Sequence, residues 1–145
     1  MARKIPAVER AVRDTLAPYV RERHMTQPEA NKTVRDGLAL VEHTVRQHLT
    51  DGWGGAFYYA HKTAQARQAY QDARGMMGRR IARGKMLGAE MFEAVYLAVR
   101  SDYKTAEDIT AEDAEAPALL AALDVVKETA AEAAARLRQA IALAA

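Results

Sequence analysis

The chain has 145 residues, a length that suits one domain with a core that needs no covalent staples. It contains no cysteine, which excludes disulfides and thiolate sites, and no apolar run reaches the roughly 20 residues of a membrane-spanning helix. The net charge of +2 hides an asymmetry, because residues 1–100 hold 17 Lys and Arg against 10 Asp and Glu, whereas residues 101–145 hold 4 against 9.

The first part of the chain predicts two amphipathic helices behind a short basic arm. The arm covers residues 1–5 and contains Arg3 and Lys4. The first helix follows directly and is expected to end or kink at Pro18. Residues 26–29, Thr-Gln-Pro-Glu, form a capping box with proline in the first turn, and they predict a second helix to about residue 49. Its expected apolar face, read from helical spacing, is Ala30, Val34, Leu38, Val41 and Val45.

One apolar stripe at helical spacing runs through residues 57–100, after a glycine-rich corner. Set at about 100° per residue, its members fall within a sector of roughly 80°. The stripe predicts one long central helix, bent at most near Gly75 and Gly78, with a break into two helices near Gly75 as the alternative. Gly75, Gly78, Gly84 and Gly88 each weaken an isolated helix by up to about 1 kcal/mol relative to alanine. We therefore expect them to permit close packing against another helix.

A final helix is expected from Thr105 or Thr110 to the C-terminus, and from about residue 111 to 145 one of its faces is strongly apolar. Chain ends normally fray into water, so an apolar end favours burial against a neighbouring subunit. The alternative is that this helix only closes the bundle of its own chain. Because no segment alternates like a strand, the predicted fold is all-α, an antiparallel helical bundle in one domain over residues 1–145, built on the long central helix.

Catalytic and metal-binding chemistry finds little support in the sequence. Ser101 is the only serine and cysteine is absent, so the chain offers almost no residue that could serve as the nucleophile of a nucleophile–base triad. Glu90 and Glu93 lie one turn apart, but the Glu-x-x-His pattern of helical dimetal sites is absent. His43 and His48 fall on different helical faces. We expect no enzymatic activity, no cofactor and no metal site.

Basic residues gather in the middle of the chain, where residues 53–88 hold 7 Lys and Arg against 1 Asp. Arginine outnumbers lysine 15 to 6 overall, which favours bidentate contacts to phosphate or carboxylate. Small residues between the arginines allow a sugar-phosphate backbone to approach the helix. The predicted nucleic-acid-binding residues are Arg3, Lys4, Arg67, Arg74, Arg79, Arg80, Arg83 and Lys85. The alternative is that this basic block pairs with the acidic residues of segment 107–115.

The basic arm, the arginine-rich helices, the glycine-marked corner and the apolar C-terminus resemble the major coat proteins of filamentous and rod-shaped archaeal viruses. The resemblance spans most of the chain and consists of architecture and composition. It implies a virion protein, made in the host cytoplasm, that polymerises around double-stranded DNA, alone or with a related coat subunit, and reads no sequence. Two other hypotheses are a small helical subunit of a CRISPR ribonucleoprotein and a helical adaptor or regulator that binds only protein.

Overall fold

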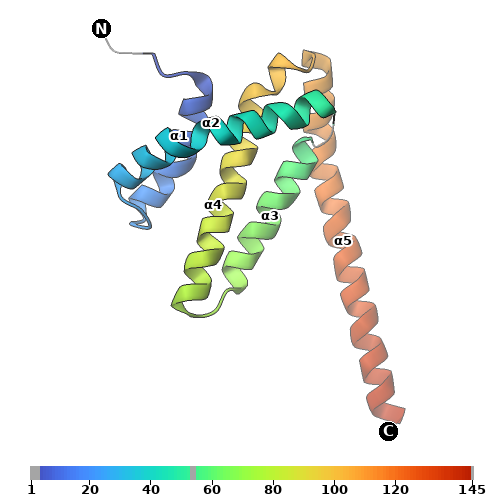
Figure 1. Ribbon diagram of the computed structural model, residues 1–145. Helices are drawn as coiled ribbons and strands as arrows, with labels where there is room; N and C mark the ends of the chain where they lie inside the picture. Colours follow the sequence, from blue (N-terminus) through green and yellow to red (C-terminus); the bar gives the residue numbers. More distant parts are fainter. Residues whose placement is uncertain (1–3, 53–54, 145) are drawn as a thin grey trace.

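The computed structural model describes residues 4–52 and 55–144, and all of the elements found there are helices (Figure 1). From residue 124 onward, side chains are described only at residues 135, 138, 139 and 141–143. The elements are α1 (Ala7–Arg21), α2 (Gln27–Asp51), α3 (Ala56–Asp72), α4 (Gly75–Val99), the short 3-10 helix η1 (Arg100–Asp102) and α5 (Ala106–Ala144). The all-α class and the helical bundle are thus confirmed. Within the described ranges, no helix combines the length and the apolar character needed to cross a membrane.

The predicted long central helix is wrong, because the chain reverses direction between α3 and α4 (Figure 1). Ala73 and Arg74 are extended, with ψ of 139° and 145°, and Gly75 follows with φ of +73°. Glycine enters this left-handed region without steric penalty, so Gly75 permits the tight connection that folds α3 and α4 into a hairpin. Helical spacing does not detect such a break, because apolar residues continue at helical spacing through both arms. Tyr59 of α3 and Met91, Val95 and Val99 of α4 lie in the same core, whereas Met77 and Ile81 near the turn are exposed.

The glycines expected to permit close helix packing do not do so within the chain. A methyl group at Gly75, Gly78, Gly84 or Gly88 would meet no described atom within 4 Å. The close-packing prediction is therefore wrong for contacts inside the described chain. Gly75 instead has the conformational role of reversing the hairpin.

Helices α1 and α2 form largely as the sequence predicts. Thr26 caps α2, its Oγ1 accepting a hydrogen bond from the N–H of Glu29 at 3.2 Å. The predicted apolar face of α2 is buried, except that Leu38 is only partly buried. Helix α1, in contrast, does not end at Pro18 but continues to Arg21. The last turn is held by packing, because Tyr19 is buried and its hydroxyl donates to Glu90 of α4.

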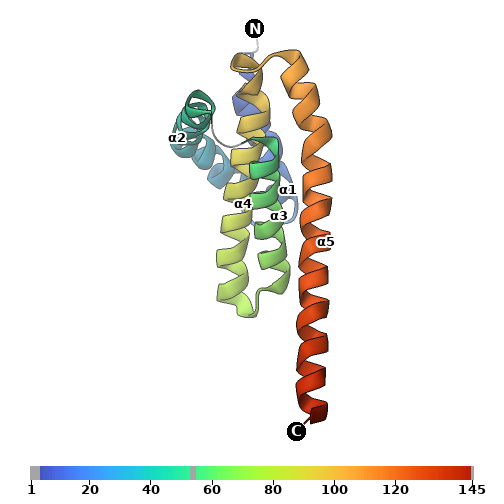
Figure 2. The ribbon, with the colours of Figure 1, turned by 90° about the vertical axis from the view of Figure 1, so that its right-hand side faces the viewer.

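Helix α4 packs against α1, α2 and α3, while α5 packs against α3 and continues past the tip of the hairpin (Figure 2). Thr105 caps α5 by accepting from the N–H of Asp108 at 3.2 Å, which confirms one of the two predicted caps. The core draws on all five α-helices and combines small and medium aliphatic side chains with two tyrosines, Tyr59 and Tyr96. Its buried residues are Val12, Leu16, Ala30, Val34, Val41, Val45, Ala56, Tyr59, Met91, Val95, Tyr96, Val99 and Ala116.

Candidate nucleic-acid interface

A cavity of about 520 Å³ lies between α4 and the turn that joins α1 to α2. We call it the arginine pocket, because Arg23, Arg80 and Arg83 line it together with His24 and Glu29. Arg80 and Arg83 are three residues apart on α4, so they share a helix face, and Arg23 comes from the turn opposite. Three guanidinium groups against a single carboxylate give the pocket a positive charge.

Arg23 is held in an unusual backbone conformation. Its φ of 63° is the only positive φ of a non-glycine residue in the part of the chain that the structure describes. The N–H of His24 donates to the carbonyl of Tyr19 at 2.8 Å, and the N–H of Arg23 donates to that of Val20 at 3.1 Å. These bonds form a Schellman motif, in which glycine is the usual residue at the position of Arg23. A side chain in this region costs about 1–2 kcal/mol, and such strain concentrates at functional sites.

The arginine pocket also contains an unused hydrogen-bond donor. The Nε of Arg83 is buried and has no partner among the described residues. A buried donor without an acceptor is unfavourable. Phosphate oxygens match the guanidinium fork in charge and geometry.

The arginines of the pocket and the predicted cations outside it make no ion pair in the described ranges, with one exception. Among residues 4–52 and 55–144, no described carboxylate oxygen lies within 4.0 Å of the charged nitrogens of Lys4, Arg23, Arg74, Arg79, Arg80, Arg83 or Lys85. Arg74 and Arg79 lie at the tip of the hairpin, and the guanidinium of Arg79 is 5.5 Å from the centre of the Tyr70 ring. Lys4 and Lys85 are exposed, and Arg3 lies outside the described residues.

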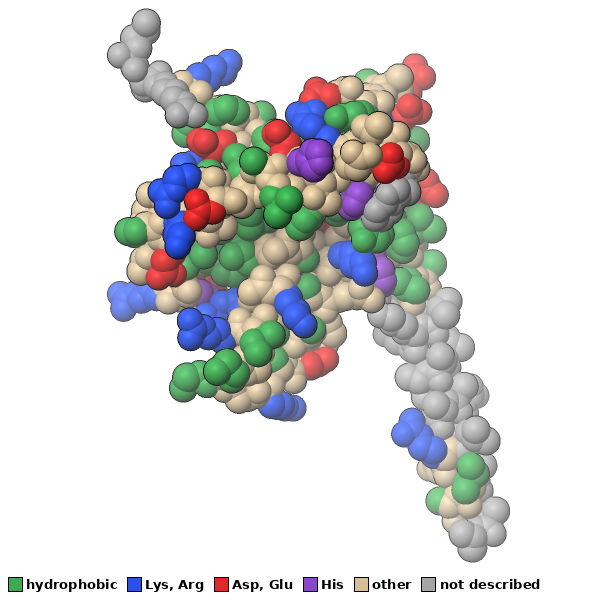
Figure 3. Space-filling model, in the orientation of Figure 1, with side chains coloured by type: hydrophobic (Ala, Val, Ile, Leu, Met, Phe, Trp, Pro, Cys, Tyr) green, Lys and Arg blue, Asp and Glu red, His purple; other side chains and the backbone are tan. Residues whose placement is uncertain are grey.

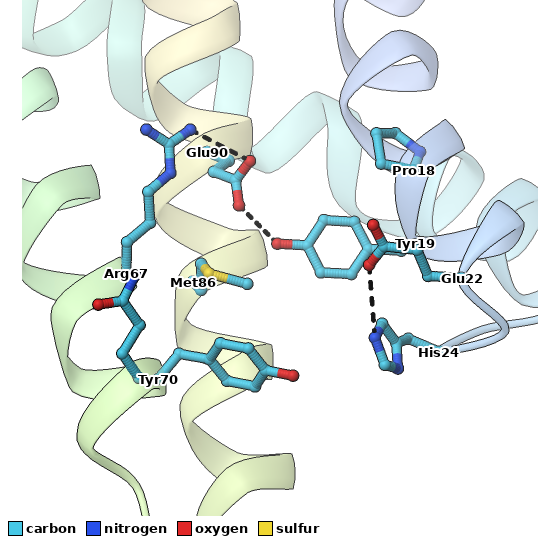
Figure 4. Close-up of a pocket in the computed structure, with 9 residues that line it drawn as sticks. Pro18, Tyr19, Glu22, His24, Arg67, Tyr70, Met86 and Glu90 are labelled. Atoms are coloured by element: carbon cyan, nitrogen blue, oxygen red, sulfur yellow. Dashed lines mark hydrogen bonds and ion pairs between the residues drawn. The ribbon is translucent and has the colours of Figure 1, made fainter.

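The exception is Arg67, which lies in a second cavity of about 340 Å³ between α1, α3 and α4 (Figure 4). Its Nη2 is 3.5 Å from a carboxylate oxygen of Glu90, whose other oxygen accepts from the Tyr19 hydroxyl at 2.6 Å. Burial and this hydrogen bond to Glu90 raise the pKa of Tyr19, so its hydroxyl stays a donor. The structure therefore separates Arg67 from the arginine pocket and gives its charge a partner within the bundle.

Two acidic residues near the start of α5, Glu112 and Asp113, pair with cations outside the predicted basic block. Glu112 accepts hydrogen bonds from the Tyr96 hydroxyl and the Ala56 N–H, and Lys104 Nζ donates to it at 3.4 Å. Arg100 forms a bidentate pair with Asp113, with N–O distances of 2.7 and 2.9 Å. The alternative in which segment 107–115 neutralises the basic block is thus wrong for the described contacts within the chain.

The pKa of Glu112 follows from these contacts. Burial pushes the pKa of this carboxyl upward, but the hydrogen bonds from Tyr96 and Ala56 and the charge of Lys104 outweigh burial and lower it. Glu112 is therefore ionised in the folded protein. It closes a polar network that reaches Tyr96, whose ring stacks on buried Tyr59 at a centroid distance of 4.7 Å. A buried Tyr59 is not a surface on which a base can stack.

Glu90 and Glu93, one turn apart on α4, are both partly buried. Burial raises the pKa of Glu93, and Glu90 is engaged by Tyr19 and Arg67. Within the described ranges, no three His, Asp or Glu side chains are grouped so that they hold a metal ion.

Arg23 and His24 line the pocket but were not predicted from the sequence. Their signal is the polar run of residues 21–24, Arg-Glu-Arg-His, which is separated from the capping box by Met25 alone. A charged run at a helix end is common on protein surfaces, so only the packing of this turn against α4 distinguishes it.

Comparison with known proteins adds no relative from which a function can be transferred. No protein family matches the chain, and neither does any curated protein or solved structure. A functional inference for this protein therefore depends on its own geometry, above all on the arginine pocket.

Proposed function

We propose that this protein is a structural subunit that binds nucleic acid, a viral coat or nucleocapsid protein that polymerises along double-stranded DNA without reading its sequence. The observation that carries the proposal is the convergence of Arg23, Arg80 and Arg83 on one cavity without an ion-pair partner among the described residues. A partner rich in phosphate supplies the missing negative charge.

The cations outside the pocket favour a long polyanion over a single small phosphate compound. Lys4, before α1, and Lys85 on α4 lie outside the pocket lining, are exposed and carry no described ion pair. A phosphate held in the pocket leaves these groups free to contact further phosphates of the same backbone. Contacts of this kind fix a duplex in place but carry no sequence information.

The proposal is tested by replacing the pocket arginines singly with alanine and titrating two short DNA duplexes of unrelated sequence. Each of Arg23→Ala, Arg80→Ala and Arg83→Ala should weaken binding equally for both duplexes. Each should also reduce the slope of log affinity against log salt by about one unit per lost phosphate contact. The matched control is Arg35→Ala on α2, an exposed arginine that pairs with Asp36. It should leave the slope unchanged.

Titrations with duplex RNA and single strands separate the related hypotheses. Tightest binding to duplex DNA supports the coat protein, whereas tightest binding to RNA contradicts it in favour of a ribonucleoprotein subunit. An absence of binding to every nucleic acid at low salt contradicts the proposal and supports an adaptor that binds only protein.

A further inference from the structure

The tip of the α3–α4 hairpin, residues 73–81, is apolar as well as basic. Met76, Met77 and Ile81 are 89%, 69% and 53% exposed there, beside Arg74 and Arg79. In Figure 3, hydrophobic and basic side chains lie together over the end of the hairpin, to the left of α5. Neighbouring exposed apolar side chains on a soluble protein mark a contact surface.

A groove with the complementary character lies at the opposite end of the hairpin. We call it the acidic groove; it has a volume of about 390 Å³ and lies between the start of α3 and the start of α5. Phe57, Ala111 and Leu119 give it an apolar lining, and Asp108 and Glu115 add negative charge. Within the described ranges neither of these two acids has an ion-pair partner, whereas Glu112 in the same groove is engaged by Tyr96 and Lys104.

We propose that the hairpin tip of one copy of this protein docks into the acidic groove of the next copy. Met76 and Met77 would contact Phe57 and Leu119 of the neighbouring copy, while Arg74 and Arg79 would face its Asp108 and Glu115. The apolar contacts supply affinity, and the opposite charges fix the orientation of the two copies.

The positions of the two surfaces determine the kind of assembly. The tip and the groove lie at opposite ends of α3, a helix of 17 residues, which is about 25 Å long (Figures 1 and 2). A contact between two different surfaces is heterologous, and it extends into an open helical filament unless the rotation between copies closes a ring. This inference deepens the proposed function by naming the contact between successive copies. It rests on the proposed function only for what the filament does, which is to cover nucleic acid.

The docking is tested with two complementary variants of the full chain. The tip variant is Met76→Glu with Met77→Glu, and the groove variant is Asp108→Arg with Glu115→Arg. The matched control is Leu40→Glu on α2, which places a charge on an apolar side chain that is 68% exposed elsewhere. Circular dichroism verifies that each variant keeps its helicity, and sedimentation velocity measures assembly without nucleic acid.

The wild type and the control should assemble with rising concentration, and each variant alone should need at least about tenfold more protein to do so. A mixture of the two variants should form 1:1 dimers and nothing larger, because only one tip and one groove in each pair remain intact. Assembly of the tip variant like that of the wild type, mixtures without dimers, or a wild type that stays monomeric with and without duplex DNA would overturn the inference. If instead the tip variant fails to assemble, yet the arginine pocket variants bind DNA as the wild type does, the docking holds and the proposed function fails.

Discussion

The arginine pocket and the cluster around Glu112 use charge in opposite ways. Around Glu112, a carboxylate accepts hydrogen bonds from three described groups, on Tyr96, Ala56 and Lys104, and Arg100 nearby is bidentate with Asp113. In the arginine pocket, cations come together from two segments and the Nε of Arg83 is buried without an acceptor. The first cluster has its partners within the chain, whereas no described carboxylate oxygen lies within 4.0 Å of the charged nitrogens of Arg23, Arg80 or Arg83 in the second.

The difference separates charges that hold the fold from charges that are available for binding. Both clusters join elements distant in the sequence, and both contain an arginine that is at least half-buried. Composition does not tell them apart, since residues 1–100 are rich in arginine throughout. What distinguishes the two clusters is whether a carboxylate is paired with the arginine. This difference predicts different consequences for substitutions around Glu112 and in the arginine pocket.

The largest effect is expected from Glu112→Ala. This change leaves the buried Tyr96 hydroxyl and the Ala56 N–H without their acceptor and removes the partner of Lys104. We expect the free energy of unfolding to fall by about 2–3 kcal/mol, as measured by urea denaturation. Glu112→Gln keeps an acceptor oxygen and should cost less than half of this.

The control for that comparison is Glu107→Gln, because Glu107 is an exposed glutamate in the first turn of the same helix, α5. It should change the free energy of unfolding by less than about 0.5 kcal/mol. Equal losses for Glu107→Gln and Glu112→Ala would mean that the general charge of α5, and not the cluster around Glu112, stabilises the fold.

A smaller effect is expected from acid. The pKa of Glu112 is lowered in the fold from its ordinary value of 4.5, so the ionised form is favoured by folding. The resulting stabilisation is present above pH 4.5 and is lost as the pH falls through the lower, folded pKa. The stability difference between the wild type and Glu112→Gln should therefore shrink as the pH falls from 6 to 3.

The comparison of the wild type with Glu112→Gln is needed because the pKa of Glu93 shifts in the opposite direction to that of Glu112. Burial raises the pKa of Glu93, so its protonation in acid favours the fold and opposes the loss from Glu112. A stability difference that stays constant down to pH 3 would contradict the role assigned to the ionised Glu112.

Most of the fold follows from local sequence signals. The Thr26 cap, the apolar face of α2 and the Thr105 cap depend on residues within a few positions of one another, and the structure has all of them. The reversal at Gly75 was harder to predict, because glycine at a helix interior and glycine at a turn differ only in φ. The continuation of α1 past Pro18 depends on a contact from Tyr19 to Glu90, which is remote in the sequence.

The candidate site was predictable only in part, for the same reason. Arg80 and Arg83 lie in a basic run that the sequence displays, and both line the pocket. Arg67 belongs to the same basic segment, residues 53–88, yet tertiary packing brings it to Glu90 instead. Arg23 joins the pocket through the packing of a turn against α4, and neither periodicity nor composition carries that information.

The smallest effect on stability is expected from Arg23→Gly, and it has the opposite sign to the loss at Glu112. Glycine relieves the strain of φ 63° at this position, offset in part by the greater freedom of the unfolded chain. The free energy of unfolding should therefore rise by about 0.5–1 kcal/mol, while DNA binding weakens as it does for Arg23→Ala. Arg23→Ala keeps the strained backbone, so it should lose binding without the gain in stability. Measured together, the two variants separate the conformational cost of Arg23 from the function of its guanidinium: an Arg23→Gly variant that binds DNA like the wild type would show that the strained turn does not serve the arginine pocket.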